Sequence, residues 1–214
     1  MHMAYRETAH TKTRKQTQHE NILAAARQRI ASGGYQSAQM QALAEDCGIA
    51  TGTVYRYFPS KAELFAEVFR QAVQAEVDAV DAAAHGQGPA GKRLQAVITT
   101  FVHRALRAPR LAYALLAEPV DPMVESERLV FRQSYAQIIE ALLVEGIASD
   151  VFAPQNPKLS AAALVGLMNE TLVGPLSPTP QTETPTRYSN MQEAELIDAI
   201  VALCMRAVSG RRTL

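Results

Sequence analysis

A short stretch in the first third of the chain carries residue types that suit contact with DNA. Residues 51–58, Thr-Gly-Thr-Val-Tyr-Arg-Tyr-Phe, place several hydroxyl groups and one guanidinium on a segment long enough for two helical turns. Small hydroxylated side chains can approach base edges closely, and Tyr and Arg side chains suit phosphate oxygens. Gly52 has no side chain, so its backbone can approach a groove. The pattern favours a DNA-reading helix; the alternative is an ordinary helical hairpin with a polar outer face.

The residues on either side of this segment have to position it. A short preceding helix is predicted from apolar residues at spacings of three and four, namely Met40, Leu43, Ala44 and Cys47. Gly48 can adopt a positive φ and end that helix in a tight turn. Pro59 ends the second helix, and Ser60 with Glu63 forms the pattern of a capping box that opens a long third helix. This order is typical of a helix-turn-helix.

Residues 47–65, Cys-Gly-Ile-Ala-Thr-Gly-Thr-Val-Tyr-Arg-Tyr-Phe-Pro-Ser-Lys-Ala-Glu-Leu-Phe, resemble the DNA-binding signature of the TetR family of transcriptional repressors. The similarity covers about Ile22 to Phe69. Two positions depart from the family pattern. Ala50 stands where a helix-capping Ser is frequent, and the loss of such a cap typically costs about 1 kcal/mol. Cys47 replaces a common Ala, a tolerable exchange for a small buried residue.

The resemblance assigns contacts with double-stranded operator DNA to residues that match the family motif. Tyr55 is expected to contact bases or backbone, whereas Tyr57 and Lys61 are expected to bind phosphates. The candidates for contact with base edges are Gln41, Thr51, Gly52 and Thr53.

The charge distribution agrees with a DNA-binding N-terminal region. The chain has no net charge, but residues 1–61 hold eight basic and four acidic residues, a net +4, and the remainder is correspondingly acidic. Residues 1–16 are predicted to form a flexible basic arm, either touching DNA or simply solvated. A capping box at Thr17 and Glu20 predicts the first helix, so the DNA-binding domain is expected over 17–61 and a second domain over 62–214.

The composition excludes several other classes of protein. Hydrophobic residues make up 48% of the 214 residues and charged ones 20%, which is ordinary for a globular protein. No run of 18 apolar residues predicts a membrane span, and no secretion signal is apparent, so we expect a cytoplasmic protein. Cys47 and Cys204 lie on different predicted elements, which fits a reducing compartment. Catalytic motifs and metal-ligand spacings are missing from the sequence, so we expect no enzyme, metal or cofactor.

Residues 62–214 read as helices throughout, and no alternating strand pattern appears, so the fold is predicted to be all-α. A proline-rich loop is predicted over Gly174 to Asn190. The predicted helices after the helix-turn-helix are Lys61–Ala84, Lys92–Arg107, Arg110–Glu118, Met123–Ser149, Lys158–Val173 and Gln192–Val208.

The middle helices carry candidates for a ligand pocket, with aromatic rings around a few polar groups. Asn169 and Glu170 are polar residues within an apolar helix, where burial without a hydrogen-bond partner would be costly. They are therefore expected either to contact a ligand or to form hydrogen bonds across a dimer contact. The candidate ligand-binding residues are Phe101, Arg104, Tyr113, Phe131, Tyr135, Met168 and Asn169.

The last two helices carry more apolar surface than the outer layer of a monomer needs, and the resemblance implies a four-helix dimer contact between them. Burial of these helices within one domain is the alternative. Our hypothesis is a homodimeric transcriptional regulator, a repressor released from its operator by a small, mostly apolar effector. By the resemblance, the effector would shift the helix Lys61–Ala84. The alternative is a helical interaction module or ligand-binding protein without specific DNA binding.

Overall fold

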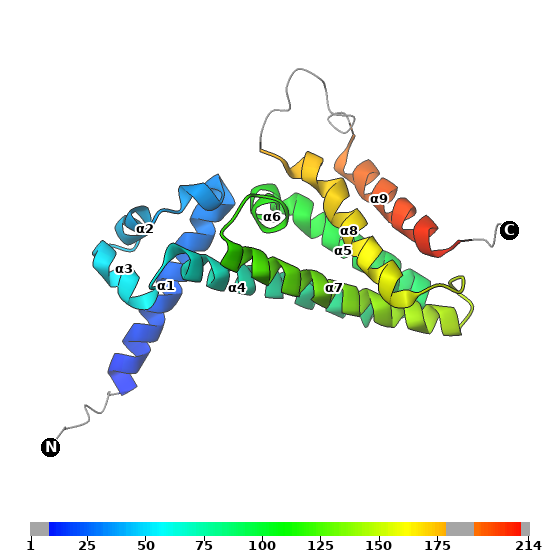
Figure 1. Cartoon of the computed structure of the whole chain (residues 1–214), viewed down its shortest axis with the longest axis horizontal. Helices are drawn as coiled ribbons and strands as arrows, with labels where there is room; N and C mark the ends of the chain where they lie inside the picture. The colour runs from blue at the N-terminus through cyan, green and yellow to red at the C-terminus, as the bar shows by residue number, and fades with distance from the viewer. Residues whose placement is uncertain (1–8, 179–190, 211–214) are drawn as a thin grey trace.

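The computed structural model describes residues 9–178 and 191–210, and every regular element among them is a helix, as predicted. Figure 1 shows a small N-terminal group of helices joined by α4 to a larger helical body. The elements in chain order are α1 (Ala9–Gly33), a 3-10 turn (Tyr35–Ser37), α2 (Met40–Asp46), α3 (Thr51–Tyr57), α4 (Lys61–Ala84), α5 (Ala90–Arg107), α6 (Pro109–Leu116), α7 (Pro122–Ala148), α8 (Pro157–Leu176) and α9 (Glu193–Val208).

The N-terminal group is the predicted helix-turn-helix packed on α1. Gly48 has a φ of 62°, which gives the tight turn between α2 and α3. The Ser60 hydroxyl accepts a hydrogen bond from the Glu63 amide at 3.1 Å, so the predicted cap of α4 is present. An ion pair between Arg29 and Asp46 fastens α1 to α2. The shared core contains Ile22, Ala26, Leu43, Val54, Phe58 and Leu64.

The first helix is longer than predicted. It begins at Ala9 rather than at Thr17, and the predicted capping box is absent. The Thr17 hydroxyl instead donates to the Thr13 carbonyl at 3.0 Å, and the Gln16 amide donates to the Glu20 carboxylate at 2.8 Å. Both are bonds across one turn of a continuous helix, and no Gly or Pro interrupts residues 9–16. Residues 1–8 lie outside the described residues, so a flexible arm there stays a prediction.

The C-terminal body is built around α4, α5, α7 and α8. In Figure 1, α7 lies along α4, α8 lies over α5, and α9 lies beside α8. The predicted bounds change little. Three helices begin one residue earlier than predicted, at Pro109, Pro122 and Pro157, because proline suits the first helical position. Helix α8 continues through Pro175 to Leu176, and most of the predicted proline-rich loop lies outside the described residues.

Helix α8 is apolar enough and long enough to cross a membrane by length and composition alone. It packs instead on α6, α7 and α9 as a core helix would. Of the residues in its most apolar stretch 39% are buried within the chain, and Leu159 of this helix is 69% exposed. Exposed apolar surface of this extent is typical of a protein contact.

Candidate DNA-binding surface and ligand cavity

The candidate base-reading residues lie on the outside of the helix-turn-helix. Val54 is fully buried, so helical geometry turns its neighbours toward the solvent. Tyr55 is 48% exposed, and a Cβ placed on Gly52 would meet no atom within 4 Å. Thr51 and Thr53 are half-buried, and Gln41 on α2 is exposed, its amide 3.3 Å from the Glu45 carboxylate.

The two candidate phosphate ligands are less exposed. The Tyr57 ring is half-buried, with its centroid 6.4 Å from that of His19. The Lys61 ammonium lies 4.6 Å from the centre of the Tyr35 ring and 5.3 Å from that of Phe65. Burial lowers the pKa of Lys61, which the nearby Glu118 partly offsets. Contact with a phosphate therefore requires the Lys61 ammonium to leave these two rings.

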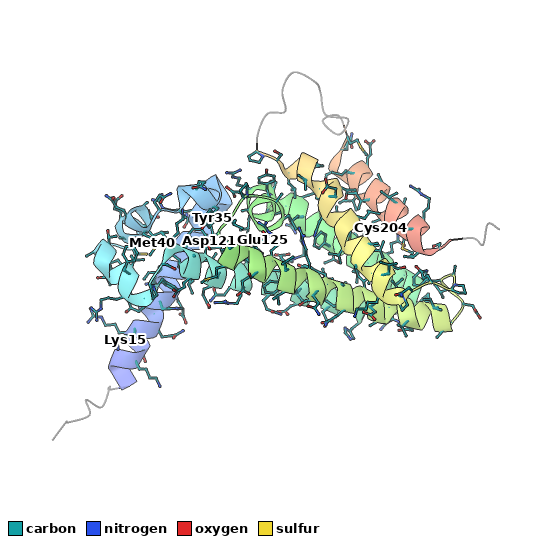
Figure 2. The ribbon with its side chains drawn as sticks, in the orientation of Figure 1. Lys15, Tyr35, Met40, Asp121, Glu125 and Cys204 are labelled. Carbon is teal, nitrogen blue, oxygen red and sulfur yellow. The ribbon has the colours of Figure 1, made fainter. Side chains whose placement is uncertain are left out.

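Four other basic side chains, which the sequence analysis associated with DNA without listing them as site residues, lie near the candidate surface. Lys12, Arg14 and Lys15 are exposed on the first turns of α1, and Arg56 is exposed on α3. Figure 2 shows Lys15 on the part of α1 that projects beyond α3. The sequence could have predicted that α1 extends over residues 9–16, because these residues include no Gly or Pro.

A polar junction joins the N-terminal helices to the larger body. The Tyr35 backbone amide donates to the Glu118 carboxylate at 3.0 Å, and the Arg110 guanidinium donates to the Gly33 carbonyl at 2.9 Å. Gly34 has a φ of 75°, and a Cβ there would lie 2.4 Å from Arg110 and 2.7 Å from Glu118. Only glycine fits this position. From the sequence, Gly34 was predicted only to end the first helix.

The aromatic ring of Tyr35 lies at this junction. It packs edge-on against Phe65 with 4.5 Å between ring centroids. Burial and the charge of Asp121 raise the pKa of Tyr35, and Figure 2 shows both residues where the N-terminal group meets the body. The first turns of α4 and the end of α6 therefore meet at Tyr35.

Arg128 on α7 holds the C-terminal end of α6. Its guanidinium donates to the backbone carbonyls of Leu115 at 2.9 Å, Ala114 at 3.2 Å and Glu118 at 3.0 Å. These contacts satisfy carbonyl groups that a helix end leaves unpaired. Burial lowers the pKa of Arg128, and its ion pair with Glu125 opposes that shift. Because the Glu118 side chain binds Tyr35, Arg128 connects α7 to the junction.

A cavity of about 70 Å³ lies between α4, α5, α6, α7 and α8. Five of the seven candidate ligand-binding residues line it: Phe101, Arg104, Phe131, Tyr135 and Asn169. Tyr113 and Met168 do not line this cavity; Met168 is fully buried in the core, and Tyr113 packs half-buried against it. Sequence reasoning missed the α4 wall (Phe69, Val73 and Glu76), the α6 wall (Leu111, Ala112, Leu115 and Leu116), and Arg128 and Arg132 of α7.

The cavity wall is mainly apolar with a few polar groups. Phe101 and Tyr135 pack edge to face at 5.2 Å, and Arg104 forms an ion pair with Glu76 of α4. Burial, reinforced by the charge of Glu76, raises the pKa of Tyr135 far above its usual range, so this hydroxyl stays protonated at neutral pH. The Asn169 Oδ1 atom is buried without a hydrogen-bond partner. Such a wall suits an apolar ligand that carries a few polar groups.

Comparison with known proteins places two family models on the chain. Residues 22–68 match bacterial regulatory proteins of the tetR family, and residues 87–173 match the tetracyclin repressor-like C-terminal domain. The first match covers the helix-turn-helix and the start of α4. The second covers most of the residues that line the cavity.

Individual proteins are also similar to this chain. A fatty acid metabolism regulator protein of Bacillus subtilis is 24% identical over 74% of this chain and 83% of its own length. The transcriptional repressor KstR of Rhodococcus jostii is 34% identical, over 45% of this chain and 44% of its own. The crystal structure of FadR from Bacillus subtilis with stearoyl-CoA has a TM-score of 0.72 at 20% identity, over 88% of this chain and 98% of its own.

Proposed function

Because the chain belongs to the TetR family and is therefore a ligand-responsive, DNA-binding transcriptional repressor, we propose that it acts as a homodimer whose effector carries a long fatty acyl chain. The relatives are bacterial regulators rather than enzymes, and action on DNA implies a cytoplasmic location. The proposed operator contacts are those of Gln41, Thr51, Gly52, Thr53, Tyr55, Tyr57 and Lys61.

The observation that carries the effector proposal is the position of the cavity. Its wall includes Phe69 and Val73 of α4, and α4 starts directly behind the helix-turn-helix. The wall is lined by rings and aliphatic side chains, which suits an acyl chain. The relatives named for fatty acid metabolism and the FadR structure with stearoyl-CoA support the same class of effector.

The size of the cavity provides a physical reason for release. At about 70 Å³ it is far smaller than typical ligand pockets of ~300–1,000 Å³. A long acyl chain therefore has to push the surrounding helices apart. An effector that binds only the expanded state shifts the population toward that state, and the shift has to outweigh the free energy with which DNA binding favours the compact state.

Two connections carry that movement to the DNA-binding helices. One is α4 itself, which runs from the cavity to Lys61. The other runs from Arg128 in the cavity wall through the end of α6 to Glu118, whose carboxylate binds the Tyr35 amide. Expansion of the cavity would displace both, and the spacing of two recognition helices in a dimer would no longer match two major grooves.

The uncovered apolar surface of α8 and α9 supports the dimer. Leu159 on α8 is 69% exposed and Leu203 on α9 is 40% exposed, although both belong to apolar helices. Burial of these side chains against a second copy removes apolar surface from water, which favours association. A two-fold dimer also pairs the recognition helices with two half-sites.

The experiment is a genomic footprint of the purified protein, followed by operator binding with and without acyl compounds. We expect palmitoyl-CoA or palmitate to weaken operator binding. Phe131→Ala should blunt the response, whereas Tyr113→Ala, a matched aromatic truncation away from the cavity wall, should leave it intact. Failure to bind any genomic fragment would favour the helical interaction module, and operator binding that no acyl compound changes would refute the effector class.

A further inference from the structure

The first turns of α1 form a helix that packing on the core does not explain. Residues 9–19 include three Lys or Arg residues, no acidic residue and one apolar residue, so they have no apolar stripe to bury. Each of residues 12–17 is exposed. The bonds from Thr17 to Thr13 and from Gln16 to Glu20 support the helix locally. Because little of this segment is buried within the chain, its surface is available to a partner.

His19 fixes the place where this segment leaves the DNA-binding helices. Its ring stacks on Phe58 with 4.7 Å between the ring centroids and lies 6.4 Å from the Tyr57 ring, both at the C-terminal end of α3. From His19, α1 extends back to Ala9, about 15 Å at 1.5 Å per residue. Figure 2 shows Lys15 on this projecting part. The segment therefore starts beside Tyr57, a proposed phosphate ligand, and extends beyond α3.

The basic residues of this segment lie on two sides of the helix. At 3.6 residues per turn, Lys12 and Lys15 lie within about 40° of His19 around the helix axis, whereas Arg14 lies about 140° away. Along the axis, Lys15 is about 6 Å and Lys12 about 10 Å from His19. Lys12 and Lys15 therefore continue the side of α1 that contacts the end of α3, and Arg14 lies on the other side.

The backbone of duplex DNA is the partner that these two lysines fit. A duplex carries one negative charge for about every 1.7 Å of its length, and a lysine ammonium binds phosphate as a point charge. With α3 in the major groove, the duplex continues past Tyr57. A helix that extends about 15 Å from that point reaches DNA beyond the half-site.

We propose that Lys12 and Lys15 bind backbone phosphates of the DNA that flanks each half-site. The contact adds to those of the helix-turn-helix and carries no sequence information, because every sequence has the same phosphates. It is made by an ordered helix and requires DNA on the outer side of the half-site. This inference rests on the proposed docking of α3 and the proposed dimer.

The test measures operator binding over a series of salt concentrations on two duplexes. One ends at the outer edges of the two half-sites, and the other carries one further helical turn, about ten base pairs, on each side. In Lys12→Ala combined with Lys15→Ala, the salt slope on the longer duplex should fall by roughly 0.9 per contact, or about 3.6 for the four contacts of a dimer. The slope on the shorter duplex should change little.

Two further variants separate the proposed contact from general attraction. Arg14→Ala removes a positive charge from the other side of the helix and should leave the slope on the longer duplex unchanged. Gln16→Pro keeps all three charges but interrupts the helix between Lys15 and His19, so it should behave like the double lysine variant. All four positions are exposed, so sedimentation should give the unmodified mass for every variant.

The outcomes distinguish this inference from the proposed function. If the operator is bound and the double lysine variant has the unmodified slope on the longer duplex, this inference alone is overturned. An equal loss in Arg14→Ala, or a full slope in Gln16→Pro, also overturns it, because general attraction or a flexible arm would then explain the effect. If the unmodified protein prefers neither duplex to unrelated DNA, the proposed operator docking fails as well.

Discussion

Glu118 should couple the cavity to the DNA-binding helices, and Glu118→Ala tests this. Glu118 is 8% exposed, and its carboxylate accepts a hydrogen bond from the Tyr35 amide at 3.0 Å. A hydrogen bond to a charged group contributes about 1.5–3 kcal/mol. Tyr35 is half-buried, so water can partly replace the lost acceptor, and we expect a loss near the lower limit, about 1.5 kcal/mol. For a chain of this length that lowers Tm by about 3–6 °C.

The informative readout is the effector response. The cavity wall is unchanged in Glu118→Ala, so acyl thioesters should bind as before. The factor by which saturating thioester weakens operator binding should shrink, because one of the two connections to the DNA-binding helices is cut. Urea unfolding measures the stability, and operator titration with and without thioester measures the coupling.

The control for this prediction is Glu127→Ala. Like Glu118, Glu127 uses its carboxylate in a polar contact between helices, here an ion pair with Arg70 at 2.6 Å, but that ion pair lies at the surface. Surface pairs contribute about 0–1 kcal/mol, so both stability and effector response should change little. If Glu118→Ala matches this control in both measurements, the junction does not transmit the response.

Three further predictions concern a phosphate contact, the dimer and the two cysteines. Lys61→Ala should weaken binding to all DNA sequences alike and reduce the salt slope by roughly 0.9 per lost contact per subunit; unchanged affinity and slope would refute a phosphate contact. Leu159→Glu combined with Leu203→Glu should give a folded monomer by sedimentation, since both side chains are exposed in one chain; a persistent dimer would place the contact elsewhere. Burial raises the pKa of Cys204 to about 11 from an ordinary 9.0, which lowers its thiolate fraction about a hundredfold below pH 9. A thiol reagent at pH 8 should therefore label half-buried Cys47 first, and equal rates would contradict the burial.

The sign of the pH dependence at Cys204 follows from the same shift. A folded-state pKa above the unfolded value means that the stability from burying the neutral thiol is complete below about pH 9. That contribution is lost as the pH rises from 9 toward 11.

The helix-turn-helix was predictable because its signals are local. Gly48 ends α2, Pro59 follows α3, and Ser60 caps α4, each within a few residues of the structure that it determines. The missing cap at Ala50 was likewise evident from one residue type. Periodicity predicted the buried faces of the longer helices, and their bounds shifted mainly by the residue at which proline begins a helix.

The contacts that connect the two parts were not predictable, because they join residues far apart in the chain. Glu118 and Tyr35 are 83 residues apart. Periodicity also marks which side chains point inward without saying which of them meet empty space. Phe131 and Met168 were both candidate ligand-binding residues, yet only Phe131 lines the cavity. The α4 wall was missed because the candidate ligand-binding residues were sought only on the helices that follow α4.

The most direct test of the central claim is one titration. The unmodified protein, bound to its footprinted operator, is titrated with palmitoyl-CoA at fixed ionic strength while the bound DNA fraction is recorded. We expect the protein to leave the operator as the acyl thioester saturates, and coenzyme A alone to have no effect. Operator binding that stays unchanged while calorimetry shows the thioester bound would contradict the account.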